Sequence, residues 1–207
     1  MIASLTEDLA PVRSFSPRHG ALLVTAAVAV SIAAVVFFEG FWHGPLAGEA
    51  APFFWIATGL LLVLGLSAAS AVIMMASPRV GNRHDAPKWA SAMFAVLPVA
   101  AVISVLPHEH GAQAITSDMY GMHCFLASLA ASLSVGAAMI FWLRQGAPVS
   151  LHTTGWFTGI AAGSLGTLAY GLSCSIDTVT HLGIWHVLPV AVSAVVGRLV
   201  VPPFVRW

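Results

Sequence analysis

Residues 20–38 of the chain read GALLVTAAVAVSIAAVVFF, nineteen residues without a charged side chain. A helix that crosses the ~30 Å hydrocarbon core of a membrane needs about 20 apolar residues. Five further runs of similar length and character follow along the chain. The six apolar runs are residues 20–38, 53–76, 90–106, 121–143, 154–173 and 182–201. The pattern predicts an all-α, polytopic membrane protein with six transmembrane helices.

The composition favours the same class of protein. Of the 207 residues, 58% are hydrophobic and only 8% are charged. Six spans of about 20 residues take up roughly 120 positions, which leaves no room for a separate catalytic domain outside the membrane. We therefore expect a cytoplasmic N-terminal segment at 1–19 and a six-helix transmembrane domain at 20–207. The formal net charge is zero and no basic patch is large enough to follow a phosphate backbone, so direct nucleic-acid binding is not expected.

The first apolar run also has features of a secretory signal peptide, because Arg13 and Arg18 precede it. Its length favours a retained helix instead. Removing it would leave five spans with a less regular charge distribution.

The positive charges predict the orientation. If the N-terminus is cytoplasmic, all eight Lys and Arg residues lie inside the cell or at the inner boundary of the membrane, as the positive-inside rule requires. These residues are Arg13, Arg18, Arg79, Arg83, Lys88, Arg144, Arg198 and Arg206. Both termini are then cytoplasmic.

The fifth run has a small residue at every fourth position, which forms a smooth ridge along one face of a helix. These residues are Gly155, Gly159, Gly163, Thr167 and Gly171. Small residues allow two helices to approach closely in lipid, so the ridge predicts close helix packing.

The opposite, outer side has a different chemistry. It contains six of the nine His residues, both Cys residues and no Lys or Arg. Its potential ligands and carboxylates are His43, His108, His110, His123, His181, His186, Glu49, Glu109, Asp118, Asp177, Met119, Met122, Cys124 and Cys174. The carboxylates would add attraction for cations.

The two cysteines are expected to be neighbours. Cys124 begins the fourth span and Cys174 ends the fifth, and the midpoint between them, Val149, falls in the turn at 144–153. In an antiparallel helical hairpin, equal helical rises from the turn bring both sulfur atoms to the same depth.

Three interpretations of this pair stay open. An oxidising outer compartment permits a disulfide. Thiol sensing would require a low pKa or an exposed sulfur atom. Thiolate with imidazole and thioether suits copper(I) or zinc. The surrounding His residues favour the metal site, with copper(I) as the first ion because Met119 and Met122 are close in sequence. The candidate metal ligands are Cys124, Cys174, His123, His181, His186 and Met122.

Several stretches carry a family resemblance. They are LTEDLAPVR at 5–13, MHCFLASLAASL at 122–133, LRQGAP at 143–148, GTLAYGLSCSIDTVTHLGIWHVLPVAVSAVVGRLV at 166–200 and the terminal RW. In these stretches the chain resembles the NrsF-type (negative regulator of sigma F) multi-pass membrane anti-sigma factors. The resemblance implies a non-enzymatic regulator in the bacterial inner membrane. Such a protein sequesters an extracytoplasmic-function sigma factor and releases it when outer-facing cysteines meet a stress signal.

Two sets of residues correspond to functional positions of that family. The paired cysteines fall on Cys124 and Cys174. The cytoplasmic partner-binding segment falls on Leu5, Glu7, Asp8, Leu9, Pro11, Val12 and Arg13. Within that segment Leu5, Leu9 and Val12 also follow the spacing of one face of a helix.

A metal-handling membrane protein or transporter with a periplasmic Cys/His site is the alternative function. Transport would require ligands deep in the spans, where Ala, Val, Leu and Gly prevail. A quinone-coupled thiol oxidoreductase would call for a CxxC pair, which the sequence lacks.

Overall fold

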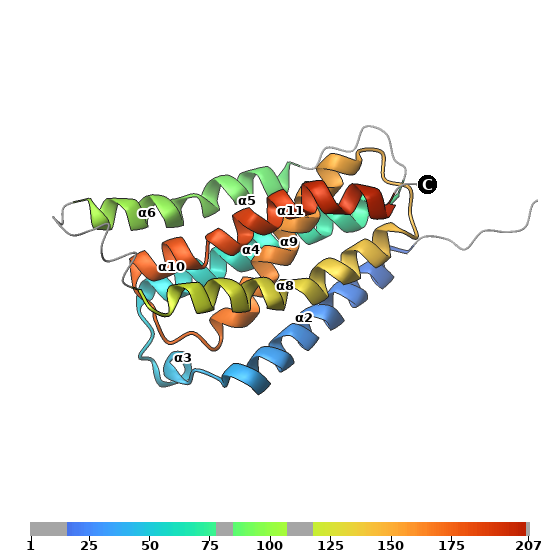
Figure 1. Cartoon of the computed structure of the whole chain (residues 1–207). Coiled ribbons are helices and arrows are strands. Elements are labelled where there is room, and N and C mark those ends of the chain that lie inside the picture. Colours follow the sequence, from blue (N-terminus) through green and yellow to red (C-terminus); the bar gives the residue numbers. More distant parts are fainter. Residues whose placement is uncertain (1–15, 78–84, 107–117, 206–207) are drawn as a thin grey trace, which may run out of the picture.

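The computed structural model describes residues 16–77, 85–106 and 118–205, and this part of the chain is helical without strands (Figure 1). The helices are α2 (Pro17–Glu39), α3 (Gly44–Ala47), α4 (Pro52–Met75), α5 (Ala86–Phe94), α6 (Val96–Val105), α8 (Gly121–Leu143), α9 (Leu151–Gly171), α10 (Val179–Trp185) and α11 (Leu188–Val205). The predicted all-α class is confirmed. The predicted partner-binding residues, between Leu5 and Arg13, lie outside the described residues, as do His108 and His110.

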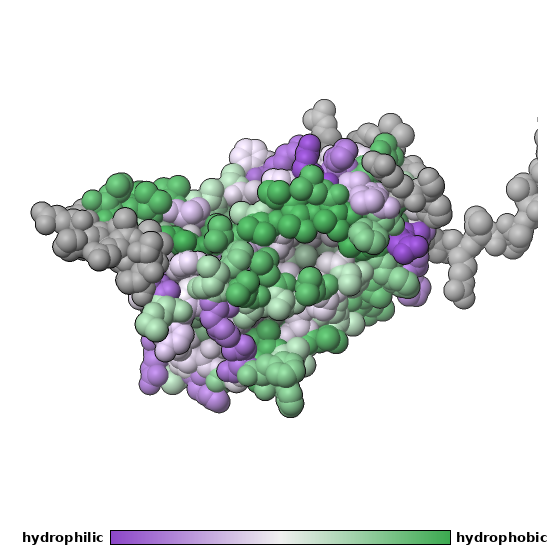
Figure 2. Space-filling view, in the orientation of Figure 1, coloured by the Kyte–Doolittle hydropathy of each residue, from purple (hydrophilic) through white to green (hydrophobic). Residues whose placement is uncertain are grey.

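Five of the six expected spans are long and apolar enough to cross a membrane. They are Pro17–Glu39, Pro52–Met75, Ala86–Val105, Gly121–Leu143 and Val179–Val205. The third and sixth spans are each interrupted, the third between α5 and α6 and the sixth between α10 and α11. Large apolar side chains such as Ile103, Leu133 and Leu199 are exposed on the outside of the bundle, and Figure 2 shows broad apolar areas on the visible face.

The remaining expected span forms α9, which is not among these five apolar segments. It lies in the centre of the bundle and packs mainly against α11, α8 and α4 (Figure 1). Most of its residues from Thr154 to Gly171 are buried. Because neighbouring helices cover α9, its Gly, Ser and Thr residues need not face lipid.

Three glycines of the predicted ridge on α9, Gly155, Gly159 and Gly163, lie directly on α11. The sequence predicts the close packing, and the structure identifies α11 as the partner helix. A Cβ atom added to Gly155 would lie 2.5 Å from the carbonyl oxygen of Gly197. One added to Gly163 would lie 2.9 Å from the Cα atom of Val190, and one added to Gly159 would collide with the carbonyl oxygen of Ser193. We call this contact the α9–α11 seam. Only glycine permits this close approach, because the atoms opposite belong to the backbone of α11.

The described positive charges lie away from α3 and α10. Arg18 is at the start of α2, Lys88 is in the first turn of α5, Arg144 follows the end of α8 and Arg198 lies in the second half of α11. In Figure 1 these parts of the helices lie toward one side of the bundle, and α3 and α10 lie at the other. This arrangement agrees with the charge segregation in the sequence, and the side that faces the cytoplasm stays a prediction.

We expect labelling from outside the cell to follow this segregation. A single cysteine at Glu49, which follows α3, should react with an impermeant maleimide in intact spheroplasts if Cys124 and Cys174 are replaced by Ser. A single cysteine at Gln145 should react only after lysis. Both positions are exposed in the structure, so the side of the membrane on which each cysteine lies decides whether the reagent reaches it. The reverse pattern would contradict the orientation.

The α9–α11 seam predicts an unusually costly glycine substitution. Gly159→Ala should destabilise the detergent-solubilised protein by about 1–3 kcal/mol, the usual cost of overpacking, and lower its thermal unfolding midpoint. Gly59→Ala on α4 is the matched control, because the added methyl group would meet no atom within 4 Å beyond the neighbouring backbone of its own helix. The control should match or exceed the parent midpoint, since Ala favours a helix over Gly. Equal midpoints for the two variants would contradict the close packing of α9 on α11.

Candidate metal centre

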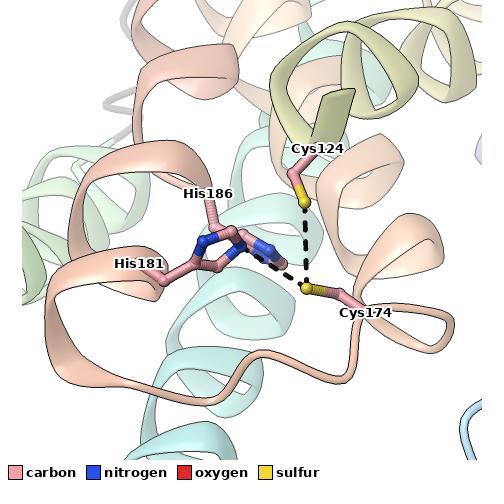
Figure 3. Close-up of side chains that lie close together, drawn as sticks. All are labelled: Cys124, Cys174, His181 and His186. Atoms are coloured by element: carbon pink, nitrogen blue, oxygen red, sulfur yellow. Dashed lines mark hydrogen bonds between the residues drawn. The ribbon is translucent and has the colours of Figure 1, made fainter. Parts of the chain in front are cut away.

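Four side chains converge at the end of the bundle where α10 lies (Figure 3). Cys124 comes from the first turn of α8, and Cys174 follows the end of α9. His181 lies on α10, and His186 lies between α10 and α11. All four residues are buried, and one potential ligand atom from each lies within 4.8 Å of the others. We call this group the Cys/His cluster.

Local sequence explains why His186 lies at a break in the last span. Pro189 has no backbone N–H group, so it cannot bond to the carbonyl group of Trp185 four residues earlier. α10 ends at Trp185 and α11 begins at Leu188. At the start of α10, the Thr178 hydroxyl accepts a hydrogen bond from the backbone N–H of His181 at 3.3 Å. This bond holds the first turn of α10.

The distances within the Cys/His cluster are short. The Sγ atoms of Cys124 and Cys174 lie 3.9 Å apart, and both cysteines are free. The predicted proximity of the two thiols is therefore observed. The Sγ atom of Cys174 lies 3.5 Å from Nε2 of His181. In a tetrahedral site with bonds of about 2.3 Å to sulfur and 2.0 Å to nitrogen, such atoms are roughly 3.5–3.8 Å apart. These two distances are close to those of a tetrahedral donor set, and all four donor atoms lie within 4.8 Å of one another.

His186 provides a second observation that fits a metal. Its Nε2 atom is buried and has no hydrogen-bond partner in the part of the chain that the structure describes. Its ring centroid lies 5.5 Å from that of His181. A buried polar atom without a partner costs free energy, and a metal ion would satisfy a nitrogen lone pair there.

Two further residues form hydrogen bonds to the Cys/His cluster. Oδ2 of Asp118 lies 2.6 Å from Nδ1 of His181. The hydroxyl group of Tyr170 donates to Sγ of Cys124 at 3.3 Å. In the sequence Asp118 is identifiable only as one of several outer carboxylates. Tyr170 is not among the predicted site residues, although it precedes Cys174 by four residues, about one helical turn.

Cys174 lacks the exposure of a reactive thiol. Its hydrogen bond with Cys124, together with burial, raises the pKa of the Cys174 thiol above that of a free cysteine. A raised pKa disfavours the thiolate that both a metal ligand and a reactive thiol require, so it does not choose between the two roles. The accessible surface of Cys174 is only 5%, whereas reactive cysteines are partly exposed.

The structure places two predicted ligands away from the Cys/His cluster. His123 is exposed, and its Nε2 atom lies 2.9 Å from Oε2 of Glu39 on α2. Met122 is 56% exposed and Met119 is 89% exposed. The reason is helical geometry, because successive residues on α8 are rotated by about 100° and only Cys124 faces the Cys/His cluster. The thioethers that favoured copper(I) are therefore not among the four ligands.

Comparisons with known proteins cover almost the whole chain. Residues 5–207 match the family model described as "Negative regulator of sigma F". The "Probable anti-sigma-F factor NrsF" of Azospira oryzae is 24% identical over 158 residues, which are 75% of this chain and 73% of that protein. The "Anti-sigma-F factor NrsF" of Caulobacter vibrioides is 25% identical over 202 residues, 94% of this chain and 93% of that protein. No solved structure matches the chain. The chain belongs to the family of negative regulators of sigma F.

Proposed function

We propose that this chain is a non-enzymatic anti-sigma factor of the bacterial inner membrane, with six spans and both termini in the cytoplasm. Its inner face holds an extracytoplasmic-function sigma factor, and metal binding at the outer Cys/His cluster releases it. Family membership and the names of the two relatives support the anti-sigma role. The observation that carries the sensing role is the set of four buried donors within 4.8 Å of one another.

The donor set indicates which class of ion to expect. Two thiolates and two imidazoles form the Cys2His2 combination that binds zinc in many proteins, and thiolates also suit copper(I). Met119 and Met122 are exposed and lie outside the Cys/His cluster, so their thioethers do not favour copper(I) over zinc. We propose a soft or borderline ion, with zinc(II) and copper(I) as the first probes.

The four proposed ligands come from different elements, which suggests how metal binding would affect the inner end of the bundle. They belong to α8, to the segment after α9, to α10 and to the break before α11. A shared ion would hold these elements in one arrangement. From His186, α11 continues along the α9–α11 seam to Val205 at the opposite end of the bundle (Figure 1). Since the backbones touch along this seam, a shift of α11 at its outer end would move its inner end as well. Release requires that the ion bind one arrangement more tightly than the other.

The alternative of a metal-handling membrane protein or transporter has less support. Apart from His181 and His186, the buried polar or charged residues in the described part of the chain are all Ser or Thr. A transport path would need further thiol, imidazole or carboxylate groups at greater depth. The Cys/His cluster lies at one end of the bundle, which suits a sensor better than a transporter.

Oxidation of the two thiols to a disulfide is a second means of sensing. The 3.9 Å separation of the two sulfur atoms favours it, because a small movement would bring them into bonding distance. An external oxidant would accept the two electrons, and two protons would leave. Neither sulfur would then be free to bind a metal as thiolate.

The metal-sensing proposal predicts one bound ion per chain. In lipid nanodiscs under reducing conditions, the full chain should bind zinc or copper(I) in a one-to-one ratio. Cys124→Ser, Cys174→Ser and His186→Gln should each weaken binding by at least about 100-fold, because they remove a ligand rather than a group that orients one. The double Cys→Ser variant should respond to stress no worse than either single variant, since the two act as one site.

Matched controls for this experiment lie on the same helix. His123→Gln and Met122→Leu should bind metal as the parent does, because neither side chain is in the Cys/His cluster. If the parent binds neither ion and non-reducing gels show a stress-induced disulfide, the thiol mechanism replaces the metal mechanism. Normal stress responses in both single Cys variants would contradict both mechanisms.

Sequestration by the N-terminal segment is a separate prediction, motivated by the apolar spacing of Leu5 and Leu9 and by a family match that begins at residue 5. Replacing both Leu residues by Ala should remove the central anchors of an amphipathic helix and activate the sigma-dependent genes constitutively. A reporter gene measures this, and an immunoblot should show normal abundance in the membrane. Arg13→Glu should have a smaller, salt-sensitive effect if Arg13 lies at the rim of the contact. Should the double variant still hold the sigma factor at the membrane, the binding surface lies elsewhere, and the loop at 77–90 is the next candidate.

A further inference from the structure

Asp118 bonds to two elements that each carry a ligand of the Cys/His cluster. Its Oδ2 atom lies 2.6 Å from Nδ1 of His181 on α10. Its Oδ1 atom accepts hydrogen bonds from the backbone N–H groups of Tyr120 at 3.2 Å and Gly121 at 3.1 Å, where α8 begins. Cys124 follows within the first turn of α8. One carboxylate thus connects the helix of Cys124 with the helix of His181.

The bond to His181 determines which imidazole nitrogen is free. A carboxylate only accepts hydrogen bonds, so Nδ1 of His181 carries the proton that it donates to Asp118. In the neutral ring, Nε2 is then left with its lone pair. Nε2 is also the atom that lies 3.5 Å from Sγ of Cys174. His181 is therefore held in the tautomer and orientation of a metal ligand.

We propose that Asp118 is the positioning residue of the Cys/His cluster. It orients His181 for a metal ion and ties the start of α8 to α10, so that the cluster is arranged before the ion arrives. This inference rests on the proposed metal-binding function. Carboxylate partners of this kind contribute about 10–100-fold to metal affinity in other proteins.

Three substitutions test whether Asp118 orients His181 or only holds the start of α8 in place. Asp118→Asn can keep its carbonyl oxygen on the N–H groups of α8, which turns its NH2 group toward Nδ1 of His181. That group donates, so the proton of His181 moves to Nε2 and blocks the ligating atom. Asp118→Ser can keep an acceptor for the N–H groups of α8 but loses the contact with His181. Asp177→Asn is the control, because it makes the same charge change while Oδ2 of Asp177 accepts from the backbone N–H of Ala51.

The experiment compares zinc affinity of the full chain in nanodiscs, measured by competition with a chelator, with the unfolding midpoint of the metal-free chain. We expect Asp118→Asn and Asp118→Ser to weaken zinc binding by about 10–100-fold. Asp177→Asn should leave it unchanged. Asp118→Asn should also alter the cobalt(II) absorption spectrum, which reports the ligands directly, while its metal-free midpoint stays near that of the parent.

The outcomes distinguish this inference from the proposed function. Parental zinc affinity and cobalt spectrum in Asp118→Asn would overturn the positioning role and leave the metal site intact. An equal loss of affinity in Asp177→Asn would also overturn it, because general charge attraction would then explain the effect. If the parent chain itself binds neither zinc nor cobalt, the metal-sensing function fails together with this inference.

Discussion

The contact of α9 with α11 is the constraint on which the rest of this structure depends. Gly155, Gly159 and Gly163 let the two backbones touch, so α11 covers one side of α9 while α4 and α8 cover others. Packing and weak polar contacts drive helix association in lipid, where the hydrophobic effect between helices is absent. A helix rich in small residues gains the most from close packing, and α9 accordingly takes the central place.

The same arrangement sets the position of the Cys/His cluster. The end of α9 brings Cys174 close to the start of α8, where Cys124 faces inward. The chain then returns through α10 and breaks at His186 before joining the seam. The four donors therefore meet where the central helix ends, and three of the four follow α9 in the chain. The Cys/His cluster thus adjoins both helices of the α9–α11 seam, through Cys174 after α9 and His186 before α11.

The helices and the proximity of the two cysteines were predictable from the sequence. Apolar runs predict the helices, because a chain in lipid must satisfy its backbone hydrogen bonds within the segment that crosses. The symmetric spacing of Cys124 and Cys174 about Val149 predicts their proximity, because helical rise is constant. Proximity in sequence was a poorer guide to the other ligands. Met122 and His123 adjoin Cys124 but point elsewhere on α8, since direction changes with each residue.

Other parts of the site depended on tertiary structure. Asp118 and His181 are 63 residues apart, and only the packing of α10 near the start of α8 brings them together. Pro189 indicates a helix break near His186, because proline cannot donate a backbone hydrogen bond. The largely apolar run at 182–201 instead predicted one continuous span. Hydropathy detects burial in lipid, and it does not detect interruptions that neighbouring helices make tolerable.

The low hydropathy of α9 also bears on how the chain enters the membrane during synthesis. Helices that leave the translocon are sorted by their apolar character, and α9 has less of it than the five apolar segments. Two of its covering helices, α4 and α8, are made before it, and α11 is made last. Because α11 follows α9 in the chain, the glycine face of α9 has no partner until α11 has been synthesised. The contacts of α9 with α4 and α8 can therefore form before the α9–α11 seam does.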